Sequence, residues 1–365
     1  MRRRRPPLGK VPGPIVITDA SAGLPYSKGL MASSVMMVGV APADAYRVAE
    51  RLEDELVERG VRQVSSAKLR DMAADLLATI DPAHAGTYLK WRAVEELDRP
   101  LIVLIGGATG VGKSTIATQL AVRLGVTRVM STDAIREVLR GAFSRELMPA
   151  LHVSSFDADA ALRVRSISSP TDHLIVGFQE QVLAVSVGIK ALIARAVEEG
   201  TDIIVEGAHV VPGFLEGWEE EFAQAVLVPV VIAVSDAETH RTHFQLRGSE
   251  AHARLRDRYL SHFDKIRALQ AYICKQAERT GAPVVENVDL DSSLQHIAGI
   301  VVEKALAQVP ASAAATAAPA TAAAPPEAAA PSGHGHRGAE LQAARRAAKA
   351  GRLVAWESSG VRRKG

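Results

Sequence analysis

Cysteine, long apolar runs and an excess of charge of either sign are all scarce in this chain of 365 residues. The single Cys274 excludes an internal disulfide framework, which favours a reducing, cytoplasmic location. The cationic run Arg2–Arg5 resembles the start of a signal peptide, but prolines and a glycine follow where an apolar segment is required. The apolar run at 30–40 is too short to span a bilayer. We therefore expect a soluble cytoplasmic protein that does not bind a membrane.

The charges nearly cancel, with a formal net charge of +2, but they are unevenly distributed. Residues 1–10 carry five cations and no acid, and residues 310–365 carry eight cations against three acids. The segment between them is therefore net acidic, which argues against a core that binds nucleic acid. We interpret the basic start of the chain as a solvated arm, and contact with an acidic surface is the less favoured alternative.

The most specific motif is the stretch LIVLIGGATGVGKSTI at residues 101–116. Its apolar half predicts a buried strand, and GATGVGKS then matches G-x-x-x-x-G-K-[ST], the phosphate-binding loop or P-loop. The glycines let backbone N–H groups point at a polyphosphate, and the N-terminus of the next helix faces the same anion. We expect Lys113 to contact the β- and γ-phosphates of ATP, and the Ser114 hydroxyl to ligate Mg²⁺. The expected nucleotide contacts are Gly107, Ala108, Thr109, Gly110, Val111, Gly112, Lys113, Ser114 and Thr115.

After the P-loop, strand and helix patterns alternate, which predicts an α/β fold with a parallel sheet and helices on both faces. Ligands bind at the carboxyl ends of the strands in such sheets. The predicted strand 126–130 leads into Asp133, which is placed to reach an acceptor hydroxyl or the Mg²⁺ shell. Arg136 follows one helical turn later and fits an anionic acceptor, because guanidinium binds phosphate or carboxylate with two hydrogen bonds. The alternative is that Thr132 or Asp133 caps the helix and the arginine is a surface residue.

A second apolar strand, predicted at 202–205, is followed by Glu206. An acid at the tip of an apolar strand beside a P-loop is the Walker B position, which holds Mg²⁺ directly or through water. The alternative is that Glu206 caps the next turn. His209 lies close by in sequence, and a lone histidine there is more typical of a hydrogen-bonded structural residue than of a catalytic base.

Two further patterns predict the core. The long helix expected at 171–199 is assigned a buried side formed by Val176, Leu183, Val187, Leu192 and Val197. A strand is expected at 226–234, where Pro229 indicates an edge or bulge position, because proline cannot donate to a sheet ladder.

Arginines are concentrated between residues 240 and 258. Phosphoryl transfer moves negative charge onto the equatorial oxygens, so kinases often close arginines over that group. We interpret Arg241 and Arg247 in this way, with Gly248 and Ser249 as the hinge of a lid and the other arginines on the surface. The alternative is a solvated charged face on two helices.

The irregular segment 141–170 is long for a connection inside an α/β domain, which is typical of a functional loop. We expect it to cover the acceptor, and the sequence does not choose among its polar candidates. A last short strand, predicted at 284–287, ends at Asn287, which is a candidate to lie beside the adenine. The candidates in the irregular segment are Arg145, His152, Arg163 and Arg165.

The N-terminal part predicts a leading strand at 15–18 and four helices, beginning near residues 28, 41, 67 and 84. It resembles the ATP-cone domain in the turn Pro25-Tyr26-Ser27-Lys28, in Gly39 and in the sequence from Ala45 to Ala49. The resemblance implies a regulatory site for ATP or dATP, with Lys28 as the phosphate contact. An ordinary surface lysine, in a domain kept for packing or for a homodimer, is an equally supported interpretation.

Residues 101–140 and 200–290 resemble the 2-phosphoglycerate kinase family. The resemblance rests on GGATGVGKST, on STD followed by IREVLR, on IVEGAHVVPG, and on the stretch from His240 through FDKIRALQAYI to VVENVD. It implies an ATP:2-phosphoglycerate phosphotransferase that makes 2,3-bisphosphoglycerate. The family's lid usually has a second arginine before the phenylalanine of its H-R-x-x-F stretch, whereas His243 stands there in this chain.

These observations predict five segments and a kinase of a small phosphorylated or carboxylated metabolite, with ATP and Mg²⁺ as cofactors. The alternatives are a zeta-toxin-like, nucleotide or polyol kinase, and a non-catalytic protein that senses ATP. A pure sensor has little need for Asp133, Glu206 and the lid arginines together. The expected segments are a basic disordered arm (1–13), an ATP-cone-like domain (14–97), a P-loop kinase domain (98–309), an Ala/Pro-rich linker (310–337) and a basic tail with one short helix (338–365).

Overall fold

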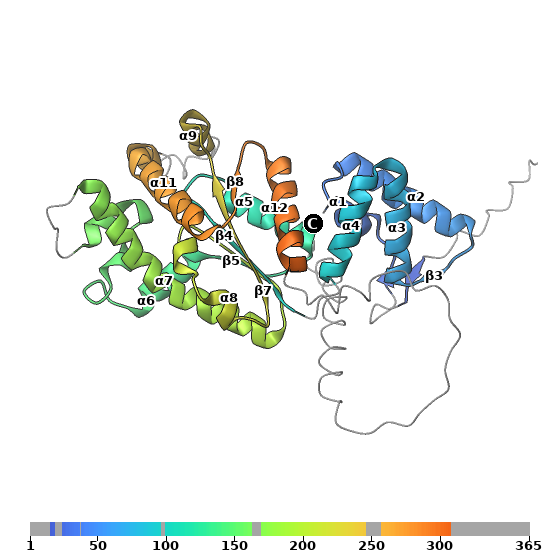
Figure 1. Cartoon of the computed structure of the whole chain (residues 1–365), viewed down its shortest axis with the longest axis horizontal. Helices are drawn as coiled ribbons and strands as arrows, with labels where there is room; N and C mark the ends of the chain where they lie inside the picture. Colours follow the sequence, from blue (N-terminus) through green and yellow to red (C-terminus); the bar gives the residue numbers. More distant parts are fainter. Residues whose placement is uncertain are drawn as a thin grey trace, which may run out of the picture. The chain divides into compact units, whose positions relative to one another are not determined.

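The structure is a computed structural model that describes residues 15–18, 24–36, 38–95, 99–162, 169–245 and 257–307. The predicted arm, linker and tail lie outside these ranges. The chain forms two compact units, and the boundary between them falls between Arg92 and Ala93 (Figure 1). Within the described ranges, no helix combines the length and the apolar character that crossing a membrane requires.

The first unit is mainly helical. Its helix α2 shows why: Ala45, Val48, Leu52 and Leu56 recur at helical spacing, and all four are buried. The hydroxyl of Ser65 caps α3 by accepting a hydrogen bond from the backbone N–H of Lys68 at 3.2 Å. Three two-residue strands form a small sheet in the order β2-β1-β3. The elements are β1 (Val16–Ile17), β2 (Leu24–Pro25), α1 (Lys28–Met36), α2 (Pro42–Glu58), β3 (Gln63–Val64), α3 (Ser66–Ile80) and α4 (Pro82–Glu95).

The second unit is built on a five-stranded sheet in the order β5-β6-β4-β7-β8, in which every strand pair is parallel. This confirms the predicted α/β fold. The strand that leads into the P-loop, β4, is central and completely buried. The carboxyl ends of β4, β5 and β6 therefore meet at one edge of the sheet. The strands are β4 (Leu101–Gly106), β5 (Val129–Ser131), β6 (Ile203–Glu206), β7 (Val226–Ala233) and β8 (Val284–Glu286).

Helices cover both faces of this sheet (Figure 1). On one side α5 and α12 pack against each other and against the strands, and on the other α7 packs against α6 and α11. The segment between α6 and α7 forms two short 3₁₀ helices, η1 and η2, which contact α7. The remaining elements are α5 (Lys113–Leu124), α6 (Thr132–Ala142), η1 (Pro149–His152), η2 (Ser155–Ala161), α7 (Pro170–Glu199), η3 (Pro212–Phe214), α8 (Trp218–Glu221), α9 (Ala237–Gln245), α11 (Phe263–Thr280) and α12 (Leu290–Ala307).

The predicted buried side of α7 is wrong for Val176, Leu183 and Val187, whereas Leu192 and Val197 are partly buried against the core. Val187 is 67% exposed and Leu183 is 57% exposed, whereas Phe178, Val185 and Ile189 on another side are completely buried. The helix has apolar residues around most of its circumference, so periodicity alone does not identify the face that meets the sheet. The polar Gln181 lies on the buried face, where hydrogen bonds compensate for its burial.

Pro229 also departs from its prediction, because β7 is an interior strand rather than an edge. The N–H of Val226 donates to the β4 side, at Pro100, and the N–H of Val231 donates to the β8 side, at Pro283. Successive backbone N–H groups of a strand point alternately to its two neighbours, so position 229 faces the β8 side, as Val231 does. The pairing of β8 begins only at Val231, so Pro229 removes no ladder hydrogen bond.

Candidate active site

The P-loop connects β4 to α5 through a backbone that only glycine adopts without strain. Gly110 and Gly112 have φ angles of 88° and 90°. A Cβ atom on Gly110 would lie 2.2 Å from the ring of Phe244, and one on Gly112 would lie 2.5 Å from Nδ2 of Asn287. The glycines are therefore required both by the turn and by the side chains that pack onto it.

Three consecutive P-loop carbonyls accept hydrogen bonds from side chains of α9 and of the segment after β8. We call these donors, His240, His243 and Asn287, the carbonyl clamp. Each clamp distance is 2.9 Å, with His240 Nε2 on Thr109, His243 Nδ1 on Gly110 and Asn287 Nδ2 on Val111. Because the C=O and N–H of a trans peptide point in opposite directions, the clamp turns the N–H groups of residues 110–112 away from itself.

The buried His240 is a neutral imidazole in this arrangement. Its Nδ1 lies 3.5 Å from Nη1 of Arg267, which can only donate, so Nδ1 accepts and Nε2 carries the proton that Thr109 receives. Burial lowers the pKa of His240, with the charge of Arg267 acting in the same direction. The ring also stacks on Phe244, with 5.5 Å between centroids, which fixes its orientation.

The two predicted Mg²⁺ ligands lie together. The Ser114 hydroxyl donates to Oε1 of Glu206 at 3.0 Å, and Glu206 ends β6 with 6% of its surface exposed. Lys113 is also buried, and its Nζ donates to the carbonyl of Ala108 at 2.6 Å. A hydroxyl and a carboxylate are the oxygen donors that Mg²⁺ prefers, so this pair fits the ion.

His209 is hydrogen-bonded on both ring nitrogens and buried, as expected of a structural histidine. Gln181 donates from Nε2 to the carbonyls of Ala150 (2.6 Å) and Val153 (3.0 Å), so its Oε1 faces His209 and accepts from Nε2 at 2.9 Å. Nδ1 of His209 then accepts from the Thr132 hydroxyl at 2.9 Å. Burial lowers the pKa of His209 to about 4. This chain of contacts, the histidine network, joins the start of α6 to η1.

The residues proposed for the acceptor occupy the start of α6. The N-cap is Ser131, whose hydroxyl accepts from the N–H of Asp133, so the prediction that Thr132 or Asp133 caps the helix is wrong. Thr132 is committed to the histidine network instead. The Asp133 side chain is 72% exposed, and its Oδ1 lies 3.8 Å from Nε of Arg136.

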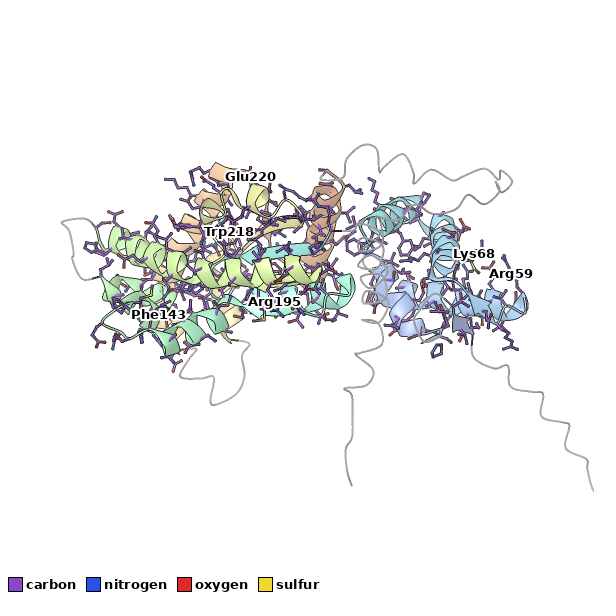
Figure 2. The ribbon with its side chains drawn as sticks, turned by 90° about the horizontal axis from the view of Figure 1, so that it is seen from below. Arg59, Lys68, Phe143, Arg195, Trp218 and Glu220 are labelled. Atoms are coloured by element: carbon purple, nitrogen blue, oxygen red, sulfur yellow. The ribbon has the colours of Figure 1, made fainter. Side chains whose placement is uncertain are left out.

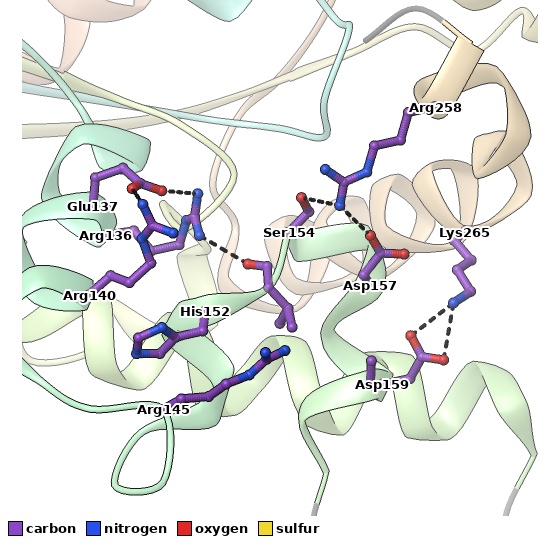
Figure 3. A pocket seen from close by; sticks show the side chains of 12 residues that line it. Arg136, Glu137, Arg140, Arg145, His152, Ser154, Asp157, Asp159, Arg258 and Lys265 are labelled. Atoms are coloured by element: carbon purple, nitrogen blue, oxygen red, sulfur yellow. Dashed lines mark hydrogen bonds and ion pairs between the residues drawn. The ribbon is translucent and has the colours of Figure 1, made fainter. Parts of the chain in front are cut away.

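Arg136 holds the segment that follows α6. Its Nη1 donates to the carbonyls of Leu151 and Val153 at 3.0 Å, and its Nη2 pairs with Glu137 at 2.8 Å (Figure 3). Only 15% of the side chain is exposed. The guanidinium therefore positions η1 while it also lines the cavity beyond α6.

That cavity has a volume of about 460 Å³ and lies between α6, the η1–η2 segment and the start of α11 (Figure 3). We call it the acceptor cavity. It contains three carboxylates, of Glu137, Asp157 and Asp159, and its only aliphatic lining residues are Val153 and Ala160. Its basic side chains are Arg136, Arg140, Arg145, His152, Arg258 and Lys265.

Of the arginines predicted to act in a lid, Arg241 lies within the described residues. Arg241 donates from Nη1 to Glu238 at 2.6 Å, and its guanidinium lies 4.5 Å above the centre of the Phe263 ring. Asn287 contacts the P-loop backbone, and its Oδ1 accepts from Ser293 at 2.9 Å, so both ends of this amide are engaged. Arg163, Arg165, Arg247, Gly248 and Ser249 lie outside the described residues.

Sequence reasoning missed the carbonyl clamp and the histidine network. Their partners are separated by 131 residues for His240 and Thr109, and by 77 for Thr132 and His209. Such pairings follow from the order of strands in the sheet, which periodicity does not give. The available signal was a polar residue among apolar neighbours, as at Gln181 in α7.

No protein-family model matches the chain. Curated relatives named 2-phosphoglycerate kinase match most of it. The relative from Thermococcus kodakarensis is 40% identical over 293 residues, which cover 80% of this chain and 98% of the relative. The one from Pyrococcus furiosus is 38% identical, covering 80% and 94%, and the one from Methanothermobacter thermautotrophicus is 39% identical, covering 75% and 89%.

Proposed function

Since this chain belongs to the 2-phosphoglycerate kinase family, we propose that it is an ATP-dependent kinase that converts 2-phosphoglycerate to 2,3-bisphosphoglycerate. The oxygen of the C3 hydroxyl bonds to the γ-phosphorus of ATP, the bond to the β-phosphate oxygen breaks, and the hydroxyl proton is released. The contact between Ser114 and Glu206 beside a basic cavity carries this proposal.

On the nucleotide side, Lys113 and the P-loop N–H groups bind the triphosphate. Mg²⁺ fits the hydroxyl of Ser114 and the carboxylate of Glu206, and it would neutralise charge on the phosphate oxygens. The buried carboxylate and ammonium lie where water is largely excluded, which strengthens their action on the developing charge.

On the acceptor side, Asp133 orients or deprotonates the hydroxyl, and Arg136 binds an acceptor anion next to it. The exposure of Asp133 and its position one turn before Arg136 support these roles. Arg241 acts on the transferring phosphoryl group from α9, which also bears the clamp residues His240 and His243. The same role for Arg247 stays a prediction.

The character of the acceptor cavity favours this function over the alternatives. Its lining is charged or small, which suits an anion better than a nucleobase, for which an apolar or aromatic slot is typical. A pure sensor of ATP would not need such a cavity next to the helix that bears Asp133. The kinase of a small anionic acceptor therefore accounts for more of the site.

The test is ADP release by the purified full-length protein with Mg²⁺-ATP, with and without 2-phosphoglycerate. We expect release to depend on the acceptor and to disappear in Lys113→Ala. Lys275→Ala is the matched control, because that lysine is exposed on α11. ATP binding without acceptor-dependent release would contradict the proposal and favour a sensor.

A second ATP or dATP in the first unit, and a homodimer through it, are separate proposals. Lys28 begins α1 and pairs with Glu53 at 2.8 Å, so a phosphate there would have to replace a carboxylate. Equilibrium dialysis of Lys113→Ala isolates this site: one remaining ATP per chain is expected, and none would contradict it. Sedimentation equilibrium tests the homodimer.

A further inference from the structure

The basic residues of the acceptor cavity differ in whether they already have a partner. Arg140 pairs with Glu137 at 2.5 Å, and Lys265 pairs with Asp159 at 2.9 Å. Arg145, by contrast, makes no hydrogen bond or ion pair with any residue in the described ranges (Figure 3). The charge of Arg145 does act on the neighbouring Glu146, which does not line the cavity. An anion that enters the cavity can therefore bind Arg145 without breaking a hydrogen-bonded ion pair.

Arg258, on the opposite side of the cavity, retains donors for the same anion. Its contacts with Ser154 (3.1 Å) and Asp157 (2.8 Å) both use Nη2. Within the described part of the chain, Nη1 and Nε form no hydrogen bond. Its guanidinium also lies 5.3 Å from the centre of the Phe156 ring, which fixes its plane. Two guanidinium groups that face one space form a site for a tetrahedral oxyanion.

The charge balance of the lining points to the same ligand. Five arginine and lysine side chains face three carboxylates, so the cavity carries a positive excess before any ligand binds. A phosphate dianion compensates that excess, whereas a neutral polyol leaves it in place. The charge of the cavity therefore favours an anionic acceptor over a neutral one.

The cavity adjoins the place of the chemistry. Arg136 lines it and lies one turn after Asp133, and Ser131 at the start of that turn pairs in register with Glu206. The Thr132 hydroxyl contacts Nδ1 of His209 at 2.9 Å, and Gln181 joins the other nitrogen of that ring to the carbonyl of Val153, which lines the cavity. An acceptor bound in the cavity therefore contacts α6, the helix that bears Asp133.

We propose that Arg145, assisted by Arg258, binds the phosphate group that the acceptor already carries and determines selectivity for phosphorylated acceptors. This inference rests on the proposed function and adds the subsite that the P-loop motifs do not specify. Arg145 is one of four polar candidates that the sequence leaves undistinguished, and its lack of a partner singles it out from His152, which contacts the carbonyl of Phe143 at 2.9 Å.

The experiment compares the wild-type protein with Arg145→Gln, Arg145→Lys and the control Arg195→Gln. Arg195 is 69% exposed on α7 and pairs with Glu199, away from the cavity lining (Figure 2). Three quantities are measured: KM for 2-phosphoglycerate, Ki for inorganic phosphate as its competitor, and KM for ATP. Thermal unfolding of each variant establishes that it is folded.

In Arg145→Gln we expect KM for 2-phosphoglycerate and Ki for phosphate to rise together by on the order of 10-fold to 100-fold, the effect of losing a charged hydrogen-bond donor. KM for ATP should not change. Lysine keeps the charge but not the fork, so Arg145→Lys should be intermediate. Arg195→Gln should match the wild type.

Two results would overturn the inference while leaving the kinase intact. One is a wild-type Ki for phosphate in Arg145→Gln, and the other is an equal rise of KM for ATP, which would indicate a general structural effect. Phosphate that does not compete with 2-phosphoglycerate in the wild type would also overturn it. A wild-type protein that does not phosphorylate 2-phosphoglycerate would instead refute the proposed function on which it rests.

Discussion

In the P-loop, buried or half-buried side chains from distant parts of the chain hold three consecutive carbonyls, whereas in the acceptor cavity charged groups meet in partly exposed ion pairs. Buried hydrogen bonds cost much to break and fix one geometry, while exposed ion pairs contribute little and exchange readily. We therefore expect the P-loop to keep one geometry, whereas the paired charges of the acceptor cavity can adjust around an anion that binds to Arg145 and Arg258.

The histidine network connects these two regions. It runs from Thr132, beside the P-loop edge of the sheet, through His209 and Gln181 to the backbone of η1. Every side chain in it is buried and no polar end is left open. The network therefore fixes η1, which borders the cavity, to the start of α6.

Among the variants that test the difference between the two regions, we expect the largest loss of activity at Glu206. Glu206→Gln keeps the shape and the contact with Ser114 but removes the charge that suits Mg²⁺. We expect kcat to fall on the order of 100-fold or more, with a higher Mg²⁺ requirement. Glu216→Gln, an exposed carboxylate in a pair with Arg279, is the control. Unchanged activity over a Mg²⁺ titration would refute the role of Glu206.

A smaller effect is expected from the carbonyl clamp. Asn287→Ala leaves the carbonyl of Val111 and the hydroxyl of Ser293 without this partner in a buried position. Such a loss costs about 1–3 kcal/mol, so we expect a lower unfolding temperature and a KM for ATP raised about 10-fold. Arg145→Gln provides the decisive contrast, because that variant should change KM for the acceptor and not KM for ATP. A clamp variant that weakened only the acceptor would contradict the division between the two regions.

The smallest effect concerns pH. Burial lowers the pKa of His209 to about 4, below its usual 6.5. Between these two pH values the histidine is protonated in the unfolded chain and neutral in the folded protein. The stabilisation is complete above pH 6.5 and is lost as the pH falls toward 4, by up to roughly 3 kcal/mol. In His209→Gln this component is absent, so its free energy of unfolding should vary less between pH 4 and 7. His240, whose pKa is also lowered, is present in both proteins and cancels in the difference. Parallel curves would contradict this assignment.

The sequence predicts the parts of the site that depend on local order. The P-loop, its strand and the acid that ends β6 follow from motif and strand pattern, and the structure brings Ser114 and Glu206 within hydrogen-bond distance. The parallel sheet with helices on both faces follows in the same way from the alternation of patterns.

What the sequence does not give depends on tertiary packing. The wrong face of α7 follows from its nearly uniform apolar character, and only the sheet decides which side is buried. Asn287 was expected beside the adenine because it ends a strand, but its contact with Val111 follows from how the last strand joins the sheet. The same holds for Arg145, whose lack of a partner is visible only when the residues around it are placed.

The most direct test of the whole account is the product of a single reaction mixture, followed by ³¹P NMR with Mg²⁺-ATP and 2-phosphoglycerate. We predict that ADP and 2,3-bisphosphoglycerate appear in equal amounts, and that neither forms in Lys113→Ala. ADP and inorganic phosphate without a bisphosphorylated product, or a product that persists in Lys113→Ala, would contradict it.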